Sequence, residues 1–407
     1  MLIAYIFIFL PTVLYSGTLA FADIAGVNFW LVLVTTVLLV GIYTVRGGLA
    51  AVVWTDVAQC IMLLGGGLVL YFVTLSHIPG GWATMAHANP ERFHLIRNST
   101  DPVAPFLGLL AASVGVFLFY NASNQVMIQR VLGARTEWDG MMGIVFSGFI
   151  NLLRPLVTCF LGFIVFYYCM QRGQMLSNPN LTFSFAVKTF GTTGLRGIIM
   201  AGFLAAVMGA ASALVNSAAT IFTLDIYGKS INPGVAEAPK ILIGRMASVA
   251  VLITAAAWCP LIGRAQTIFT YFQTGVTYLA TPFIAVILVG IFWKRPSALA
   301  GSVGLVGGLT IQILVALGAK LLFATGYLHQ PLHWLYVAFV GEFLTILMVL
   351  ATSLATSPAP AEQVAGLVWR PALVFAHMDR RQRWYKNVLM WYLVYSSLWF
   401  SLYYHFR

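Results

Sequence analysis

Asp56 is a charged residue with apolar neighbours on both sides in the sequence. It stands in the apolar stretch "RGGLAAVVWTDVAQ", which runs from Arg46 to Gln59. A lone carboxylate among apolar neighbours is poorly solvated, so it needs water, a cation or a basic partner. Asp56 is therefore a candidate cation ligand. The alternative is a structural hydrogen bond near the end of a membrane helix.

Two further stretches carry polar side chains that suit a polar solute. In "FLFYNASNQVMIQRVLGAR", Tyr120 and Asn124 are four residues apart, which places them on one face of a helix. They can bind a solute or hold two helices together. In "FTYFQTGVTYLATPF", Gln273 precedes Pro282, which removes a helical hydrogen bond and can interrupt the helix. Interrupted helices line the binding cavities of many transporters.

The stretch "AAVMGAASALVNSAATIFTLDIYGK", from Ala205 to Lys229, consists largely of small residues. On a membrane helix such residues permit close packing, or they leave oxygen atoms free to coordinate an ion. Arg154 and Glu342 are also charged residues inside apolar stretches. We assign both a structural role.

No catalytic or metal-binding constellation accompanies these residues. The seven histidines do not stand at catalytic or metal-ligand spacing from carboxylates or cysteines, and no GxxxxGK[ST] phosphate loop is present. The four cysteines show no paired spacing. We therefore expect neither an enzyme, nor an ATP-driven pump, nor a bound cofactor.

The composition describes a membrane protein. The chain is 60% hydrophobic and only 8% charged, which lies outside the range of soluble domains. Its net charge of +11 comes from residues dispersed over short loops, as cytoplasmic loops require, and we expect no nucleic-acid partner. We predict an all-α, multi-pass protein of the plasma (inner) membrane, with the lipid bilayer as its surroundings.

Apolar runs long enough to cross a bilayer predict about eleven spans. The Lys and Arg residues of the intervening loops favour a cytoplasmic Met1 and an external C-terminus. The predicted spans are 2–21, 28–45, 50–75, 105–128, 142–170, 197–226, 240–261, 267–292, 297–322, 333–353 and 387–404.

Four of these stretches resemble signatures of the sodium:solute symporter family, which includes the sodium/glucose cotransporters. "RGGLAAVVWTDVAQ" is similar to its Gly-Gly-Leu-x-Ala-Val-x-Trp-Thr-Asp motif, and "NQVMIQRVLGAR" to its Asn-Gln…Gln-Arg-x-Leu-x-Ala motif. "NSAATIFTLDIYGK" and "YFQTG…GIFWKR" resemble two further blocks. The resemblance runs from the first span at least to Arg295.

The resemblance implies a LeuT-like inverted-repeat fold in a single transmembrane transporter domain, 1–407. Core helices would occupy about 1–293 and peripheral helices about 297–407, with a cytoplasmic linker at 354–386. Such a protein moves a small-molecule solute by alternating access, driven by a sodium gradient. Tyr120 matches an aromatic inner gate, Gln273 a sugar-binding glutamine, and Asp56 a carboxylate linked to sodium. With Asn124, these residues form the predicted substrate and ion sites.

Two departures from the family pattern bear on sodium coupling. Met1 matches the third core helix, so the first repeat is incomplete, as it would be in a fragment or in a sequence with a wrongly assigned start. In the sodium helix, Gly209 and Ala210 stand where two serines are usual. The carbonyl of Ala206 remains as an ion ligand, and Ser212 with Asp56 matches a second sodium site of some members.

We therefore predict secondary active sodium:solute symport of a small polar solute, with a sugar or polyol favoured. Sodium, assigned to Asp56, Ala206 and Ser212, is the only metal ion expected, and its coupling is expected to be weakened by the lost hydroxyls. One alternative is a non-transporting membrane sensor or scaffold on the same fold. Another is a proton-coupled or uncoupled transporter in which Asp56 carries H+.

Overall fold

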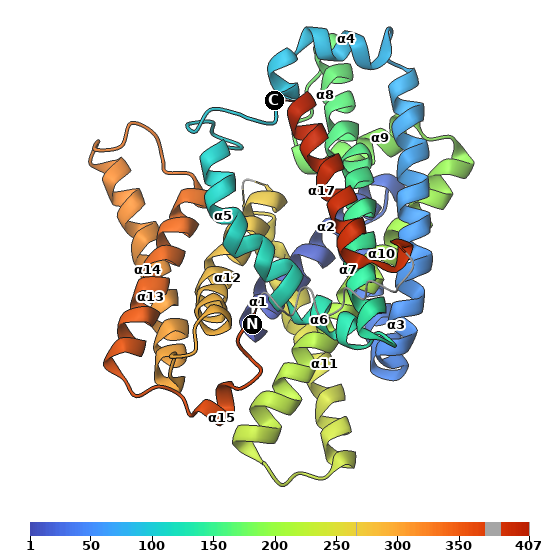
Figure 1. Cartoon of the computed structure of the whole chain (residues 1–407). Coiled ribbons are helices and arrows are strands. Elements are labelled where there is room, and N and C mark those ends of the chain that lie inside the picture. Colours follow the sequence, from blue (N-terminus) through green and yellow to red (C-terminus); the bar gives the residue numbers. More distant parts are fainter. Residues whose placement is uncertain (266, 371–383, 407) are drawn as a thin grey trace. The chain divides into compact units, whose positions relative to one another are not determined.

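The computed structural model describes residues 1–265, 267–370 and 384–406, without the side chains of residues 45–53 and 122 (Figure 1). The described chain is helical apart from its turns and loops. It forms two compact units, one of residues 1–92 and 149–273 and the other of residues 93–148 and 274–407. Each unit is described by itself. The prediction of a single transporter domain remains a prediction.

The first unit begins with a nearly continuous helix that comprises α1 (Leu2–Ala4), the π-helical η1 (Tyr5–Phe9) and α2 (Leu10–Ala25). The long helix α3 follows. Its two apolar segments, on either side of residues 45–53, correspond to two of the predicted spans. The remaining elements of this unit are α3 (Phe29–Ser76), α4 (Gly81–Ala88), η4 (Leu156–Phe160), α8 (Leu161–Gln171), η5 (Pro179–Leu181), α9 (Thr182–Phe190), α10 (Thr193–Thr220), η6 (Ile221–Ile231) and α11 (Glu237–Ile262).

The second unit contains the helix pair α13 and α14, which pack along each other, with α5 against α14. Two long helices, α7 (Glu137–Pro155) and α12 (Ile268–Phe292), and the short η2 (Pro90–Phe93) carry residues of both units. The other elements are α5 (Phe106–Leu118), η3 (Phe119–Ser123), α6 (Gln125–Leu132), α13 (Ala298–Ala324), α14 (Trp334–Ala355), α15 (Ala361–Val364), η7 (Trp384–Lys386) and α17 (Val388–His405).

Each of the eleven predicted spans corresponds to a helical segment. In the described part of the chain, eight helices are long and apolar enough to cross a membrane, and α5 with α6 makes a ninth span if this pair, bent by 50°, is counted as one. Two predicted spans remain. One corresponds to Phe29–Thr44, the shorter apolar first part of α3, and the other to α17. Helix α17 is rich in Trp and Tyr, residues that favour the membrane interface.

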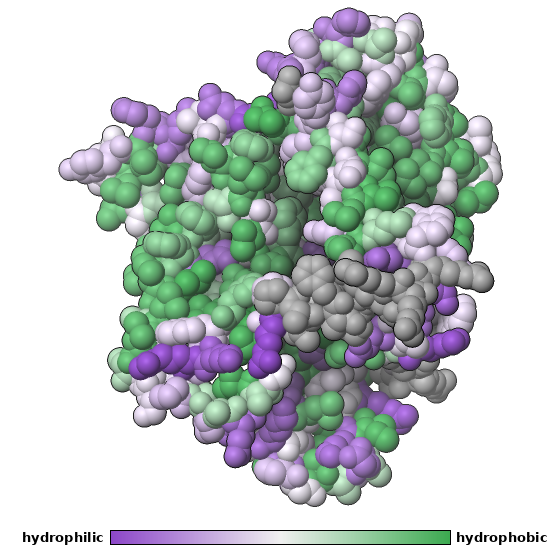
Figure 2. Space-filling model, viewed as in Figure 1, coloured by the Kyte–Doolittle hydropathy of each residue, from purple (hydrophilic) through white to green (hydrophobic). Residues whose placement is uncertain are grey.

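Helices α13 and α14 each carry an exposed apolar face. Large apolar side chains on both helices are exposed, among them Val306, Leu317 and Phe343. In Figure 2 hydrophobic side chains cover the middle of this helix pair, and hydrophilic side chains lie toward its ends. This distribution fits a membrane-spanning pair. Of the predicted cytoplasmic linker 354–386, residues 371–383 lie outside the described part of the chain.

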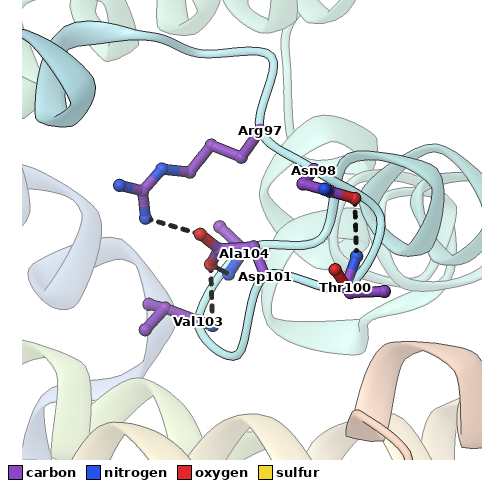
Figure 3. A network of polar contacts seen from close by, with 6 residues as sticks. All are labelled: Arg97, Asn98, Thr100, Asp101, Val103 and Ala104. Carbon is purple, nitrogen blue, oxygen red and sulfur yellow. Dashed lines mark hydrogen bonds and ion pairs between the residues drawn. The ribbon is translucent and has the colours of Figure 1, made fainter.

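A polar network fixes the loop that connects the short helix η2 to α5 (Figure 3). The carboxylate of Asp101 accepts hydrogen bonds from the backbone N–H groups of Val103 and Ala104, at 2.9 and 2.8 Å, and pairs with Arg97 at 3.0 Å. The Tyr336 hydroxyl of α14 donates to the Ser99 carbonyl at 2.7 Å. The loop is thus anchored to the beginning of α14.

Candidate functional site

The contact between α3 and α10 forms the first part of the candidate site. A β carbon added to Gly209 of α10 would stand 2.2 Å from Oε1 of Gln59 and 2.8 Å from Oδ1 of Asp56. A β carbon at Gly202 would similarly come within 3.2 Å of Cβ of Met62. The small residues therefore permit close packing. At Gly209, the atoms of α3 that lie nearest to the glycine are side-chain oxygens.

Asp56 and Gln59 present these oxygens together because they are three residues apart on one helix face. The Asp56 side chain is half-buried. From the earlier segment of α3, the Tyr43 hydroxyl donates a hydrogen bond to the Met208 carbonyl, next to Gly209. Oxygen atoms of Asp56, Gln59 and Tyr43 thus lie against one turn of α10, and oxygen is the ligand type that hard cations prefer.

Ser212, one turn after Met208, adds a hydroxyl to the same region. Its side chain is fully buried. It makes no hydrogen bond within the described part of the chain, although the Tyr43 hydroxyl lies close to it and within electrostatic range of Asp56. Asp56 of α3 and Ser212 of α10 thus both lie near the Tyr43 hydroxyl, and their assignment to one sodium site remains a prediction.

The two positions that lack the usual serines face different ways. Gly209 is buried against α3, whereas Ala210 is exposed within its unit. Ala206 lies one turn earlier and is half-buried. Of the two lost hydroxyls, only the one at residue 209 would therefore face Asp56 in this unit.

Tyr120 and Asn124 lie in the second unit, where the helix is broken. Residues Phe119–Ser123 form a π-helical turn, and Asn124 is extended with φ −72° and ψ 120°. Oδ1 of Asn124 accepts a hydrogen bond from Val126 N at 3.0 Å and so caps α6. The prediction that both residues share one face of a regular helix is therefore wrong, because the backbone changes direction between them.

Tyr120 is half-buried at this break and packs against a small cluster made by α5 and α14. Its buried members are Ala112, Val116 and Leu335, with Trp334 alongside. The packing of α5 against α14 therefore determines where the Tyr120 ring lies. The described structure thus places Tyr120 and Asn124 at an irregular segment, the kind of backbone that membrane proteins tolerate where it lines a cavity or is covered by protein.

Gln273 lies in the first unit, half-buried in the second turn of α12. The preceding residues fix this end of the helix. The Tyr271 hydroxyl donates to the Phe7 carbonyl at 2.6 Å and accepts from Nε1 of Trp258 at 2.9 Å, and Phe272 packs edge-on against Phe9. Helix α12 continues through Pro282 as one helix.

Sequence reasoning missed Gln59 and Tyr43. Gln59 ends the motif "WTDVAQ", three residues after Asp56, and that spacing was a signal available in the sequence. The approach of Tyr43 to Met208 joins residues 165 positions apart. A single sequence gives no indication of that contact.

A cavity of about 560 Å³ in the same unit does not contain any of the predicted site residues. It lies between α3, η4 with α8, the η5–α9 segment and α10, and its lining is mainly apolar, with Met62, Gly67, Ile199 and Phe203 among its walls. Thr158, Asn180 and Thr182 are among its few polar residues. Its chemistry does not match a site for a polyhydroxylated solute.

Comparison with known proteins identifies the family to which the four motifs point. The profile of the sodium:solute symporter family matches residues 1–308. The chain is 30% identical to the sodium/glucose cotransporter of Vibrio parahaemolyticus over 377 residues, which cover 87% of this chain and 67% of that protein. It is 28% identical to the sodium/myo-inositol cotransporter of Bos taurus, over 89% of this chain and 57% of that protein.

A solved structure of a Na+-coupled sialic acid symporter, in its substrate-bound outward-open state, has a related fold. It matches with a TM-score of 0.69 at 20% identity, over 88% of this chain and 73% of that chain. This similarity confirms the predicted LeuT-like fold class. The chain spans between about three fifths and two thirds of the length of the two cotransporters.

The matched profile covers three quarters of the chain, and the helices, the four motifs and the fold agree with it. The prediction of a transporter rather than an enzyme is confirmed by this family, as is that of an integral, multi-pass membrane protein, for which the plasma membrane is typical. The chain belongs to the sodium:solute symporter family.

Proposed function

We propose that this protein couples the uptake of a small polar solute, a sugar or polyol, to the entry of Na+. Relatives that cover most of the chain are cotransporters of sodium with glucose or myo-inositol. The structural observation that carries the proposal is the approach of Asp56 and Gln59 to Gly209, which gathers oxygen ligands at the helix expected to bind sodium.

In this proposal Asp56 and Ser212 supply the charged and the hydroxyl ligand of one Na+ site. Gln59 compensates for the missing hydroxyl at residue 209, because its carboxamide oxygen occupies the space that a side chain there would take. The carbonyl of Ala206 is one turn away on α10 and would contribute only where the helix opens. Sodium coupling is then weakened less than the loss of two serines alone would suggest.

For the solute we assign direct contacts to Tyr120 and Gln273. Tyr120 presents an aromatic face with a hydroxyl, and Gln273 a carboxamide, and both groups suit the apolar faces and hydroxyls of a sugar. Asn124 acts differently, since its Oδ1 caps α6. Its role is to hold the helix break beside Tyr120.

The test is uptake into proteoliposomes that contain the purified full chain. Radiolabelled glucose and myo-inositol are supplied with an inward Na+ gradient, or with K+ in place of Na+. We expect accumulation only with Na+ for at least one of the two solutes, and its loss in Asp56→Asn. The control is Thr254→Val, which changes an exposed hydroxyl of α11.

Variants then separate the two sites. Ser212→Ala and Gln59→Leu should raise the Na+ concentration needed for half-maximal uptake, whereas Tyr120→Phe should change the KM for solute at saturating Na+. Uptake that is equal with Na+ and K+ in the unmodified chain would contradict the proposal.

Proton coupling is the second candidate, because neither Gly209 nor the exposed Ala210 offers a hydroxyl ligand to Na+. In that case Asp56 carries H+ instead of helping to bind Na+. The same vesicles with an inward pH gradient and no Na+ would then accumulate solute, and Asp56→Asn would abolish the response. If neither gradient drives uptake of either solute, a membrane sensor or scaffold becomes the better assignment.

A further inference from the structure

A cavity of about 360 Å³ in the first unit is lined by polar side chains that the proposed transport function does not use. It lies between α3, the end of α10 with η6, and α11. No carboxylate is among its described lining residues. Its polar residues are Thr44, Asn216, Thr220, Thr223, Arg245 and Ser248.

Three polar atoms of this lining are buried without a hydrogen bond within the described part of the chain. They are Nδ2 of Asn216 and the hydroxyls of Thr44 and Thr223, and both threonines are only 5% exposed. The Tyr43 hydroxyl lies close to that of Thr44. Burying a polar group without a hydrogen bond is costly, and buried polar groups in native proteins are usually paired. Three such groups around one cavity indicate a polar occupant.

The other two hydroxyls are already engaged. Thr220 donates to the Asn216 carbonyl at 2.7 Å, and Ser248 donates to the Gly244 carbonyl at 2.9 Å. Their hydrogen atoms are therefore directed at the helix backbone. The groups left to bind an occupant are the Asn216 amide, the two unpartnered hydroxyls and the guanidinium of Arg245.

Every member of this set can donate a hydrogen bond, and the set carries positive charge. The NH2 group of Asn216 and the guanidinium of Arg245 can only donate hydrogen bonds, and threonine hydroxyls can donate as well. Guanidinium groups bind carboxylates and phosphates with paired, charge-assisted hydrogen bonds. With no acidic residue among the described lining, the complementary ligand is an oxygen-bearing anion.

We propose that this cavity binds a small oxyanion, with Arg245 as its charged partner and Asn216 and Thr223 as buried donors. Its volume is at the lower end of small-molecule sites, so it holds a phosphate or a small carboxylate together with water. Asn216 is one turn beyond Ser212, about 6 Å along the helix. A bound anion therefore lies near the proposed cation site, where it favours cation binding.

The site is tested by direct binding to the detergent-solubilised full chain. The probes are radiolabelled inorganic phosphate and radiolabelled acetate, each titrated at constant ionic strength. We expect saturable binding of at least one probe, and the stronger of the two identifies the ligand as a phosphate or a carboxylate. Asn216→Asp keeps the side-chain shape but adds a negative charge, so it should weaken binding at least tenfold, as should Arg245→Gln.

Two control variants make the same two substitutions at residues of the same unit that do not line the cavity. Arg264→Gln removes a positive charge from the other end of α11, and Asn232→Asp adds a negative charge at the exposed end of η6. Both should bind the probe like the unmodified chain. The proposal is overturned if neither probe binds saturably, since the cavity then holds water alone. Equal binding by all four variants overturns it too. Neither result depends on sodium-driven uptake.

Discussion

The carboxylate of Asp56 on α3 lies against Gly209 on α10, with Oδ1 only 2.8 Å from the position that a β carbon of residue 209 would take. Oε1 of Gln59 is closer still, at 2.2 Å. No side chain fits there unless one of these two moves away. Glycine at this position therefore determines how near two polar side chains of one helix approach the backbone of the other.

The first prediction concerns this contact. Gly209→Ala should lower the free energy of unfolding by about 1–3 kcal/mol, the usual cost of inserting a methyl group into a packed contact. Gln59→Ala in the same chain should restore most of the loss, because it removes the side chain that a β carbon would meet first. Thermal unfolding in detergent measures both.

Gly197→Ala is the matched control for this prediction. It lies on the same helix, and a β carbon there meets nothing within 4 Å. Replacing glycine by alanine within a helix is then neutral or stabilising. If Gly209→Ala were as well tolerated as Gly197→Ala, the close approach of Gln59 would not exist in solution.

The sequence could predict the helices but not this contact. Runs of apolar residues fix where a span lies, and each of the eleven predicted spans is helical. The side chain that faces Gly209 depends on how α3 rotates against α10, and apolar periodicity does not specify this on helices that are hydrophobic all round. Motif resemblance singled out Asp56 and Ser212, and the spacing of Gln59 from Asp56 was visible in the sequence, whereas the contact of Tyr43 with Met208 emerges only from the tertiary structure.

The broken helix shows a second limit of the sequence. Pro282 was the visible helix breaker, yet α12 continues through it. The break lies instead at Phe119–Asn124, which contains neither proline nor glycine. There a π-helical turn and the capping side chain of Asn124 redirect the backbone. Asparagine is a strong cap, but whether it caps a helix or lies inside one depends on the surrounding packing.

The second prediction follows from that cap. Asn124→Ala should destabilise the protein by about 1 kcal/mol, since α6 then loses the acceptor for Val126 N. Asn124→Asp keeps the acceptor and should retain most of the stability. Asn121→Ala is the control three residues earlier, since its side chain is exposed and only donates to the Phe117 carbonyl. Equal losses in Asn124→Ala and Asn124→Asp would argue against a capping role.

The third prediction concerns Glu342, which is 4% exposed on α14. Its Oε2 makes no hydrogen bond within the described part of the chain and lies 2.1 Å from where a β carbon of Gly115 would stand. Burying a polar atom without a hydrogen bond is costly, and a carboxamide has the shape of the carboxyl group without its charge. Glu342→Gln should therefore be tolerated, whereas Glu342→Ala should cost about 2–3 kcal/mol by leaving a cavity.

Gly115 offers an independent test of the same contact. Gly115→Ala places a methyl group on the Glu342 carboxyl and should destabilise the α5–α14 pair, while Gly318→Ala on α13, where nothing lies within 4 Å, should not. Thermal unfolding in detergent compares the four variants. A large loss in Glu342→Gln would show that the carboxyl is charged and paired in solution, contrary to this interpretation.

The last prediction is a pH dependence of the loop that precedes α5. Hydrogen bonds from the Ala104 and Val103 N–H groups, together with Arg97, hold the pKa of Asp101 below its ordinary value of 3.8. Burial lowers the pKa of His333 below its ordinary value of 6.5. His333 also caps α14, since its Nδ1 accepts a hydrogen bond from Leu335 N at 3.3 Å, and that nitrogen must be unprotonated to do so.

The sign follows from these two shifts. Both groups bind protons less readily in the folded protein than in the unfolded chain, so the stability they contribute is lost as the pH falls. The loss begins below about pH 6.5 with His333 and continues below pH 3.8 with Asp101. The protection of these amides against hydrogen exchange, relative to the intrinsic rate at each pH, should therefore fall in two steps as the pH is lowered, first at Leu335 and then at Val103 and Ala104. In His333→Asn, which keeps a capping side chain but does not titrate, the step at Leu335 should disappear while the later step at Val103 and Ala104 remains. An unchanged step at Leu335 in that variant would assign the pH dependence to another group.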